Sequence, residues 1–122
     1  MKYLIGVDEG TTGCKSCIFD QNGNLVTSAS REYPSYYPHP GWVEQDIEEI
    51  KTAVFDSIKE CIVSAGRMGV KSEDIVAISH SNQGITMVLK NRNERLLAYS
   101  IKVHFLLPIT WKLDQCYCHH QL

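Results

Sequence analysis

Two short glycine-containing turns near the N-terminus constrain the fold more than any other feature of this chain. They lie between three segments that have the residue types of strands, and turns this short join only antiparallel neighbours. The second turn carries Asn22-Gly23, the strongest short-range signal of a β-hairpin. The chain is therefore predicted to begin with a three-stranded antiparallel meander, whose strands are residues 2–8, 14–20 and 25–33.

An amphipathic helix is predicted after the meander. Apolar residues recur at spacings of three and four over residues 47–65, which places them on one helix face. Asp46 is a good N-cap residue, and Glu48 and Glu49 put negative charge where the helix dipole favours it. Gly66 is expected to end the helix.

Further strands are expected beyond the helix. The apolar run 75–78 predicts a buried strand, and residues 86–89 and 96–101 are predicted to form two more around a turn at 91–94. Three strands, a helix and then more strands indicate an α/β domain with a mixed sheet.

Length and charge narrow the functional classes. The chain has 122 residues, the length of one domain, and a formal net charge of −2. That charge gives no electrostatic argument for binding nucleic acid or an anionic membrane. No stretch approaches the roughly 20 apolar residues of a membrane span, and no secretory signal is visible, so a cytoplasmic location is expected.

The five cysteines are expected to be free thiols, because their number is odd and the chain has no secretory signal. Cys14 and Cys17 form a C-x-x-C pair within a predicted strand, where this spacing puts the two thiols on opposite faces. A C-x-C-H-H run at 116–120 has metal-ligand residue types, but its spacing is not a standard zinc pattern.

The first turn is the strongest candidate for chemistry. Thr11 and Thr12 bear hydroxyl donors, and the glycines beside them let backbone N–H groups approach an anion closely. Asp8 can hold Mg²⁺ through water, and Lys15 can offer a charge to a phosphate. Most Gly-Thr-Thr-Gly turns are only turns, so the residues alone leave both interpretations open. Neither G-x-x-x-x-G-K-[ST] nor G-x-G-x-x-G is present.

Three stretches, in order along residues 3–101, resemble the FGGY family of carbohydrate kinases. They are Ile5-Gly6-Val7-Asp8-Glu9-Gly10-Thr11-Thr12-Gly13-Cys14-Lys15, then Pro40-Gly41-Trp42-Val43-Glu44-Gln45-Asp46, then Ile75-Val76-Ala77-Ile78-Ser79-His80-Ser81-Asn82-Gln83. The resemblance implies part of an actin-like ATPase fold built from ribonuclease-H-like domains, with ATP and Mg²⁺ as cofactors. It also implies which residues contact the ligands. The ATP phosphates would meet Thr11, Thr12, Gly13 and Lys15, magnesium would face Asp8, and a sugar or polyol would lie near Gln83 and Gly84.

The chain departs from the family at two places. Glycerol kinases have an Arg-Glu pair where this chain has Gly84 and Ile85, whose side chains cannot pair with hydroxyls. That difference favours another polyol or a ketose over glycerol. Residues 1–101 are therefore interpreted as the N-terminal part of the first kinase domain, and 102–122 as a divergent tail resembling a frameshifted ending.

The resulting hypothesis is a truncated kinase that transfers the ATP γ-phosphoryl group in its parent form and is inactive alone, because the catalytic base lies outside this chain. A non-catalytic remnant and a fragment of another actin-like ATPase stay open as alternatives. Apolar residues in the tail predict self-association.

Other residues carry weaker alternatives. Tyr33, Tyr36, Tyr37 and Trp42 can stack on a sugar, although packing of their loop is favoured. Glu44 and Asp46 fit helix capping better than acid–base catalysis. His80 lies at the substrate-side end of a predicted strand and is a candidate for contact with the substrate, although a core or surface role is favoured.

Overall fold

The computed structural model describes residues 1–83, 87–90, 92–93 and 96–100. The chain divides into two units, and each is considered by itself. The first contains residues 1–36 and 45–83, and the second contains residues 37–44 together with the chain from residue 84 onward.

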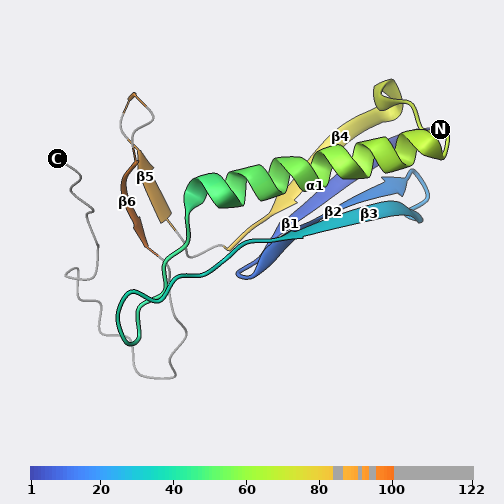
Figure 1. Ribbon diagram of the computed structural model, residues 1–122. Coiled ribbons are helices and arrows are strands. Elements are labelled where there is room, and N and C mark those ends of the chain that lie inside the picture. The colour runs from blue at the N-terminus through green and yellow to red at the C-terminus, as the bar shows by residue number, and fades with distance from the viewer. Residues whose placement is uncertain (84–86, 91, 94–95, 101–122) are drawn as a thin grey trace. The chain divides into compact units, whose positions relative to one another are not determined.

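The first unit is a four-stranded sheet with one long helix against one face (Figure 1). The strands β1, β2 and β3 form the predicted antiparallel meander, and β4 adds to β1 in parallel, giving the order β3-β2-β1-β4. This arrangement confirms the predicted mixed sheet. The elements are β1 (Tyr3–Glu9), β2 (Gly13–Asp20), β3 (Leu25–Glu32), α1 (Ile47–Arg67), η1 (Ser72–Asp74) and β4 (Ile75–Ser81).

The helix α1 begins as the sequence predicts but ends later. The Asp46 side chain accepts a hydrogen bond from the Glu48 N–H at 2.8 Å, which confirms the N-cap. The expected stop at Gly66 is wrong, because the helix continues through Arg67. The chain turns at Gly69, whose φ of 90° lies in the left-handed region that glycine adopts without steric cost.

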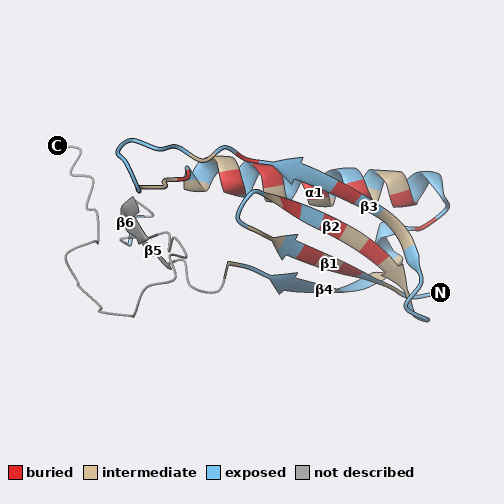
Figure 2. Cartoon of the chain, turned by 90° about the horizontal axis from the view of Figure 1, so that it is seen from below, coloured by how far each residue is buried: buried red, intermediate tan, exposed pale blue. Residues whose placement is uncertain are grey.

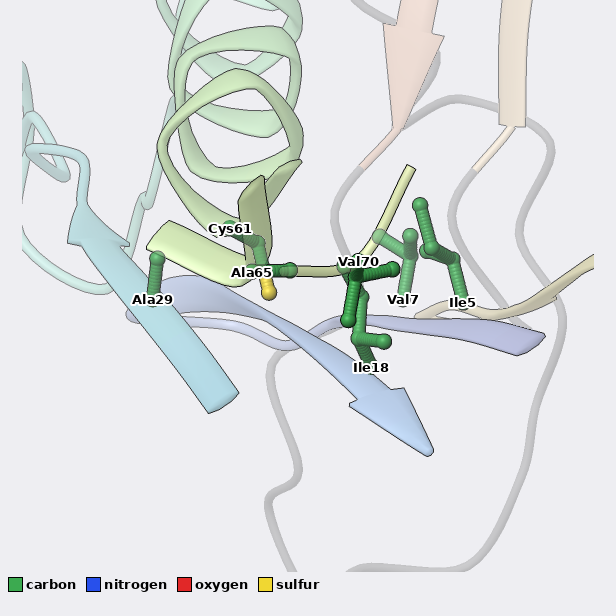
Figure 3. Packing of buried hydrophobic residues seen from close by; sticks show 7 residues of the cluster. All are labelled: Ile5, Val7, Ile18, Ala29, Cys61, Ala65 and Val70. Atoms are coloured by element: carbon green, nitrogen blue, oxygen red, sulfur yellow. The ribbon is translucent and has the colours of Figure 1, made fainter. Parts of the chain in front are cut away.

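The core lies between α1 and the sheet, and much of it is built from small side chains (Figure 3). On the helix these fall at every fourth position, so that they form one stripe facing the strands. The helix residues of this stripe are Ala53, Ser57, Cys61 and Ala65. Cys61 and Ala65 belong to one buried cluster with Ile18 and Ala29, whereas Ala53 belongs to a second with Cys14 and Tyr33.

A pair of buried hydroxyls sits inside this interface. Ser16 Oγ and Ser57 Oγ lie 2.7 Å apart, and both residues are fully buried. Ser57 Oγ also donates to the Val54 carbonyl at 2.8 Å, so the remaining proton at the pair comes from Ser16. The C-x-x-C thiols face opposite ways as predicted, since Cys14 is buried beside Ser57 and Cys17 is only partly buried.

Residues 75–78 form a strand as predicted, but the prediction that this strand is buried is wrong. The strand exists as β4, but Val76 is 53% exposed and Ile78 is 63% exposed (Figure 2). The reason is that α1 lies over β2 and β3, while β4 pairs only with β1 among the described residues.

In the second unit, β5 (Met87–Lys90) and β6 (Leu96–Ser100) pair as an antiparallel hairpin, close to the strands expected at 86–89 and 96–101. Within residues 37–44, the rings of His39 and Trp42 meet edge to face, with centroids 4.4 Å apart. This contact lies within the loop, so it does not test the expectation that the loop packs on the domain.

We expect Ser57→Ala to lower the free energy of unfolding by about 1–3 kcal/mol, because it leaves the buried Ser16 hydroxyl without a partner. The double variant Ser16→Ala/Ser57→Ala should recover part of that loss. Urea denaturation measures both, with Thr52→Ala on the exposed side of α1 as the control. A double variant no more stable than Ser57→Ala would contradict this account.

We also expect two glycines to respond oppositely to alanine. A Cβ on Gly13 would lie 2.5 Å from the Arg31 carbonyl oxygen, so Gly13→Ala must displace backbone and should cost about 1–3 kcal/mol. A Cβ on Gly66 meets nothing within 4 Å inside the helix, so Gly66→Ala should stabilise by up to about 1 kcal/mol. Thermal unfolding of the two variants measures the change in stability. Equal changes in Gly13→Ala and Gly66→Ala would contradict this expectation.

Candidate functional site

The candidate site lies at the edge of the sheet where β1 and β4 end. These two strands are parallel, so the turn that follows β1 and the loop that follows β4 emerge at the same edge. In open α/β sheets, ligands bind at the carboxyl ends of parallel strands. The topology therefore brings the predicted phosphate turn and the predicted substrate residue Gln83 to one edge.

Asp8 and Lys15 face each other across the first hairpin. They are register partners on β1 and β2, and both are exposed. Their neighbours Val7, Cys14 and Ser16 are buried toward α1, so alternation puts Asp8 and Lys15 on the opposite face of the sheet. This face carries one negative and one positive side chain next to the turn.

The turn between β1 and β2 is closed by its own backbone. The Gly10 N–H donates to the Gly13 carbonyl at 2.8 Å. Thr11 and Thr12 lie at the tip and are exposed. Packing alone requires a glycine at position 13, because the backbone of β3 runs directly beside it.

Tyr33 is a buried residue that holds the backbone of the turn by hydrogen bonds. It is 6% exposed, and its hydroxyl donates to the carbonyls of Gly10 and Gly13, the second at 3.0 Å. Its own N–H donates to the Thr12 carbonyl at 3.3 Å. Burial raises the pKa of the Tyr33 hydroxyl to about 12, with the charge of Glu9 as the next cause, so this donor keeps its proton at neutral pH.

Gln45 is a second buried support. It is 5% exposed, and its Nε2 donates to the Thr11 carbonyl at 2.6 Å and to the Ser35 hydroxyl at 3.2 Å. Its Oε1 accepts from Gln83 Nε2 at 3.4 Å. One side chain thus bonds to both the predicted phosphate turn and the first residue of the predicted substrate pair.

His80 lies beside the residue that precedes the turn. Its Nε2 is 3.4 Å from Glu9 Oε2, so the two form an ion pair when the imidazole is protonated. His80 is opposite Val7 in the parallel register and therefore on the α1 side of the sheet, away from Asp8 and Lys15. This position does not bring it to the face that carries the predicted phosphate and magnesium side chains.

The described residues suit magnesium only at a site with few protein ligands. No group of three or more His, Cys, Asp or Glu side chains with metal-binding geometry occurs among the described residues. Asp8 offers one exposed carboxylate, and such a donor fits Mg²⁺, which keeps several waters and takes few protein ligands. Gly84, the other predicted substrate residue, lies outside the described residues.

Tyr33 and Gln45 are the supports that sequence reasoning missed. Tyr33 was expected to stack or pack through its ring, and Gln45 only marked a motif. A buried polar side chain leaves no periodic signal in a loop, and their partners are backbone carbonyls 20 to 34 residues away.

No helix among the described residues is long and apolar enough to cross a membrane.

Comparison with known proteins places the chain in a family. Residues 3–106 match the model for the FGGY family of carbohydrate kinases, N-terminal domain. A glycerol kinase of Malacoplasma penetrans is 40% identical over 99 residues, covering 81% of this chain and 19% of the relative. The chain thus spans about a fifth of the length of the curated relatives it matches.

Solved structures show the same relationship. A ligand-bound xylulose kinase from Lactobacillus acidophilus superposes with a TM-score of 0.65 at 34% identity, over 83% of this chain and 19% of that one. A gluconate kinase from Lactobacillus acidophilus gives 0.64 at 34% identity, over 82% and 19%. With the family match, they establish the actin-like ATPase fold for this partial α/β domain. The chain belongs to the FGGY family of carbohydrate kinases, and it corresponds to the N-terminal domain of that family.

Proposed function

We propose that this chain supplies the phosphate-binding hairpin and part of the substrate wall of an ATP-dependent sugar or polyol kinase. The observation that carries the proposal is the meeting, at one sheet edge, of the β1–β2 turn with Gln83 after β4, joined through Gln45. The family assignment favours a carbohydrate kinase over another actin-like ATPase.

In this proposal the hairpin binds the phosphates of ATP. The hydroxyls and N–H groups of Thr11 and Thr12 stabilise negative charge as the γ-phosphoryl group moves to a sugar hydroxyl. Lys15 adds a positive charge on the same side, and Asp8 holds the hydrated magnesium that accompanies the nucleotide. Gln83 orients a substrate hydroxyl.

The substrate is proposed to be a polyol or a ketose. The curated relative named above is a glycerol kinase, whereas the two solved structures are a xylulose kinase and a gluconate kinase. The Gly84-Ile85 pair, which replaces the charged pair of glycerol kinases, weighs against glycerol. Both residues lie outside the described part of the chain.

The chain by itself is proposed to be inactive. The proposal gives a role to the β1–β2 turn and to Gln83, but to none of the described residues as the base that takes the proton of the substrate hydroxyl. General-base catalysis contributes about 10²–10⁴ in rate, and positioning of the two substrates contributes several orders more. The division at residue 101, with a divergent tail that promotes self-association, stays part of this proposal.

We expect no sugar-dependent ADP release from the purified 122-residue chain. A coupled assay with a panel of glycerol, xylulose, gluconate and other sugars measures this, with Asp8→Ala run beside the wild type. Sugar-dependent turnover that disappears in Asp8→Ala would show that the chain is an enzyme by itself and would refute this part of the proposal.

Phosphate binding should persist weakly, because its contacts come from one hairpin. We expect Lys15→Met to weaken pyrophosphate binding about tenfold at low salt, since it removes a charged donor beside the turn. Isothermal titration measures the affinity. Lys59→Met is the matched control, because Lys59 is an exposed lysine on α1, and its replacement should change the affinity little. Equal losses in both variants would indicate nonspecific charge attraction instead of this site.

A further inference from the structure

We propose that Tyr33 and Gln45 are positioning residues that aim the N–H groups of the β1–β2 turn at phosphate, and that Gln45 couples this turn to Gln83. The inference rests on the proposed function, because it assumes that the turn binds phosphate. It adds two residues and a connection between sites that the sequence pattern does not reveal.

The first observation is that every carbonyl of turn residues 10–13 accepts a hydrogen bond. Tyr33 contacts three of them, since the Gly10 and Gly13 carbonyls share its single hydroxyl proton and its N–H donates to Thr12. The Gly13 carbonyl also accepts from the Gly10 N–H. The fourth carbonyl, which belongs to Thr11, accepts from Gln45. The acceptors of the turn are therefore held by residues of the connection that leads from β3 to α1.

Held carbonyls fix the direction of the amides. A trans peptide unit is planar, and its N–H points opposite to its C=O; the structure contains no cis peptide bond among the described residues. When the Gly10 carbonyl points to Tyr33, the Thr11 N–H points away from Tyr33. When the Thr11 carbonyl points to Gln45, the Thr12 N–H points away from Gln45. Two consecutive donors are thereby turned outward, which is the arrangement of an anion-binding turn.

The chemistry of the two side chains suits this task. The buried Tyr33 hydroxyl keeps its proton through the neutral range and remains a donor beside the acidic residues of β1. An amide such as Gln45 donates and accepts at the same time, whereas a carboxylate only accepts. Gln45 uses both functions, toward Thr11 through Nε2 and toward Gln83 through Oε1.

The second observation is the connection from Gln83 to the turn. The contacts Gln83 Nε2 to Gln45 Oε1, at 3.4 Å, and Gln45 Nε2 to Thr11 O, at 2.6 Å, form a chain of two hydrogen bonds. The Gln83–Gln45 hydrogen bond, at 3.4 Å, is the longer and weaker of the two. A substrate hydroxyl that binds Gln83 would therefore compete with this weaker bond. Substrate binding at Gln83 is thereby linked to the orientation of the Thr11 peptide.

The positioning role is tested by titrating the ¹⁵N-labelled full chain with pyrophosphate. In the wild type, the Thr11 and Thr12 amide resonances should shift. Tyr33→Phe and Gln45→Glu should bind about five- to tenfold more weakly and show altered Thr11 and Thr12 resonances before ligand is added. Tyr36→Phe is the matched control, because the Tyr36 hydroxyl bonds only to exposed Glu49 among the described contacts, and its replacement should change neither quantity.

The outcomes separate the two hypotheses. If wild-type Thr11 and Thr12 resonances ignore pyrophosphate, the proposed phosphate site is wrong, and the positioning role falls with it. If the wild type binds but folded Tyr33→Phe and Gln45→Glu variants bind equally well, only the positioning role is overturned. Unchanged resonances of buried β1 and β2 amides show that a variant is folded, and the two variants test the role independently.

The coupling is tested by a double-mutant cycle. Gln83→Ala should weaken pyrophosphate binding about threefold in the wild type and leave it unchanged in Gln45→Met, because the connection is already broken there. The hydrogen bond of Gln83 goes to Gln45 and not to the turn, so a purely local role for Gln83 predicts no effect in either background. The same loss in both backgrounds, or no loss in either, overturns the coupling.

Discussion

The close approach of α1 to the sheet is the constraint on which the other features of the first unit depend. It is made possible by small residues at every fourth helix position, from Ala53 to Ala65, which let the helix lie near β2 and β3. The two serines there are fully buried, so their hydroxyls need protein partners, which are each other and the Val54 carbonyl. The packing also fixes the N-terminal end of α1, and the residues just before it carry Gln45 to the β1–β2 turn.

The side-chain supports of the turn come from the connection between β3 and α1, and they add to the Gly10–Gly13 hydrogen bond within the turn. Tyr33 follows β3 directly, and Gln45 precedes the N-cap of α1, so both ends of the connection are anchored to regular elements. Tyr33 and Gln45 hold the turn by donating to its backbone carbonyls, which are present whatever the residue types of the turn. The geometry of the turn therefore depends partly on residues outside its own sequence, whereas Thr11 and Thr12 at its tip are exposed.

The sequence predicted the elements well because their signals are local. The Asn22-Gly23 hairpin, the Asp46 cap and the helical apolar spacing each depend on neighbours within a few residues, and all three are confirmed. Burial was predicted less well. Val76 and Ile78 have the residue types of a buried strand, yet whether they are covered depends on which element packs over β4, and no local pattern carries that information.

The candidate site also combines residues that a local sequence signal identifies with residues that it does not. The resemblance named the turn residues and Gln83, because motifs are contiguous, and topology brings them to one edge. The roles proposed for Tyr33 and Gln45 depend on contacts across 20 or more residues, so only coordinates reveal them. The exposed apolar side chains of β4 follow from the same physics. A strand with buried-strand composition and one neighbour among the described residues presents Val76 and Ile78 as surface for further packing.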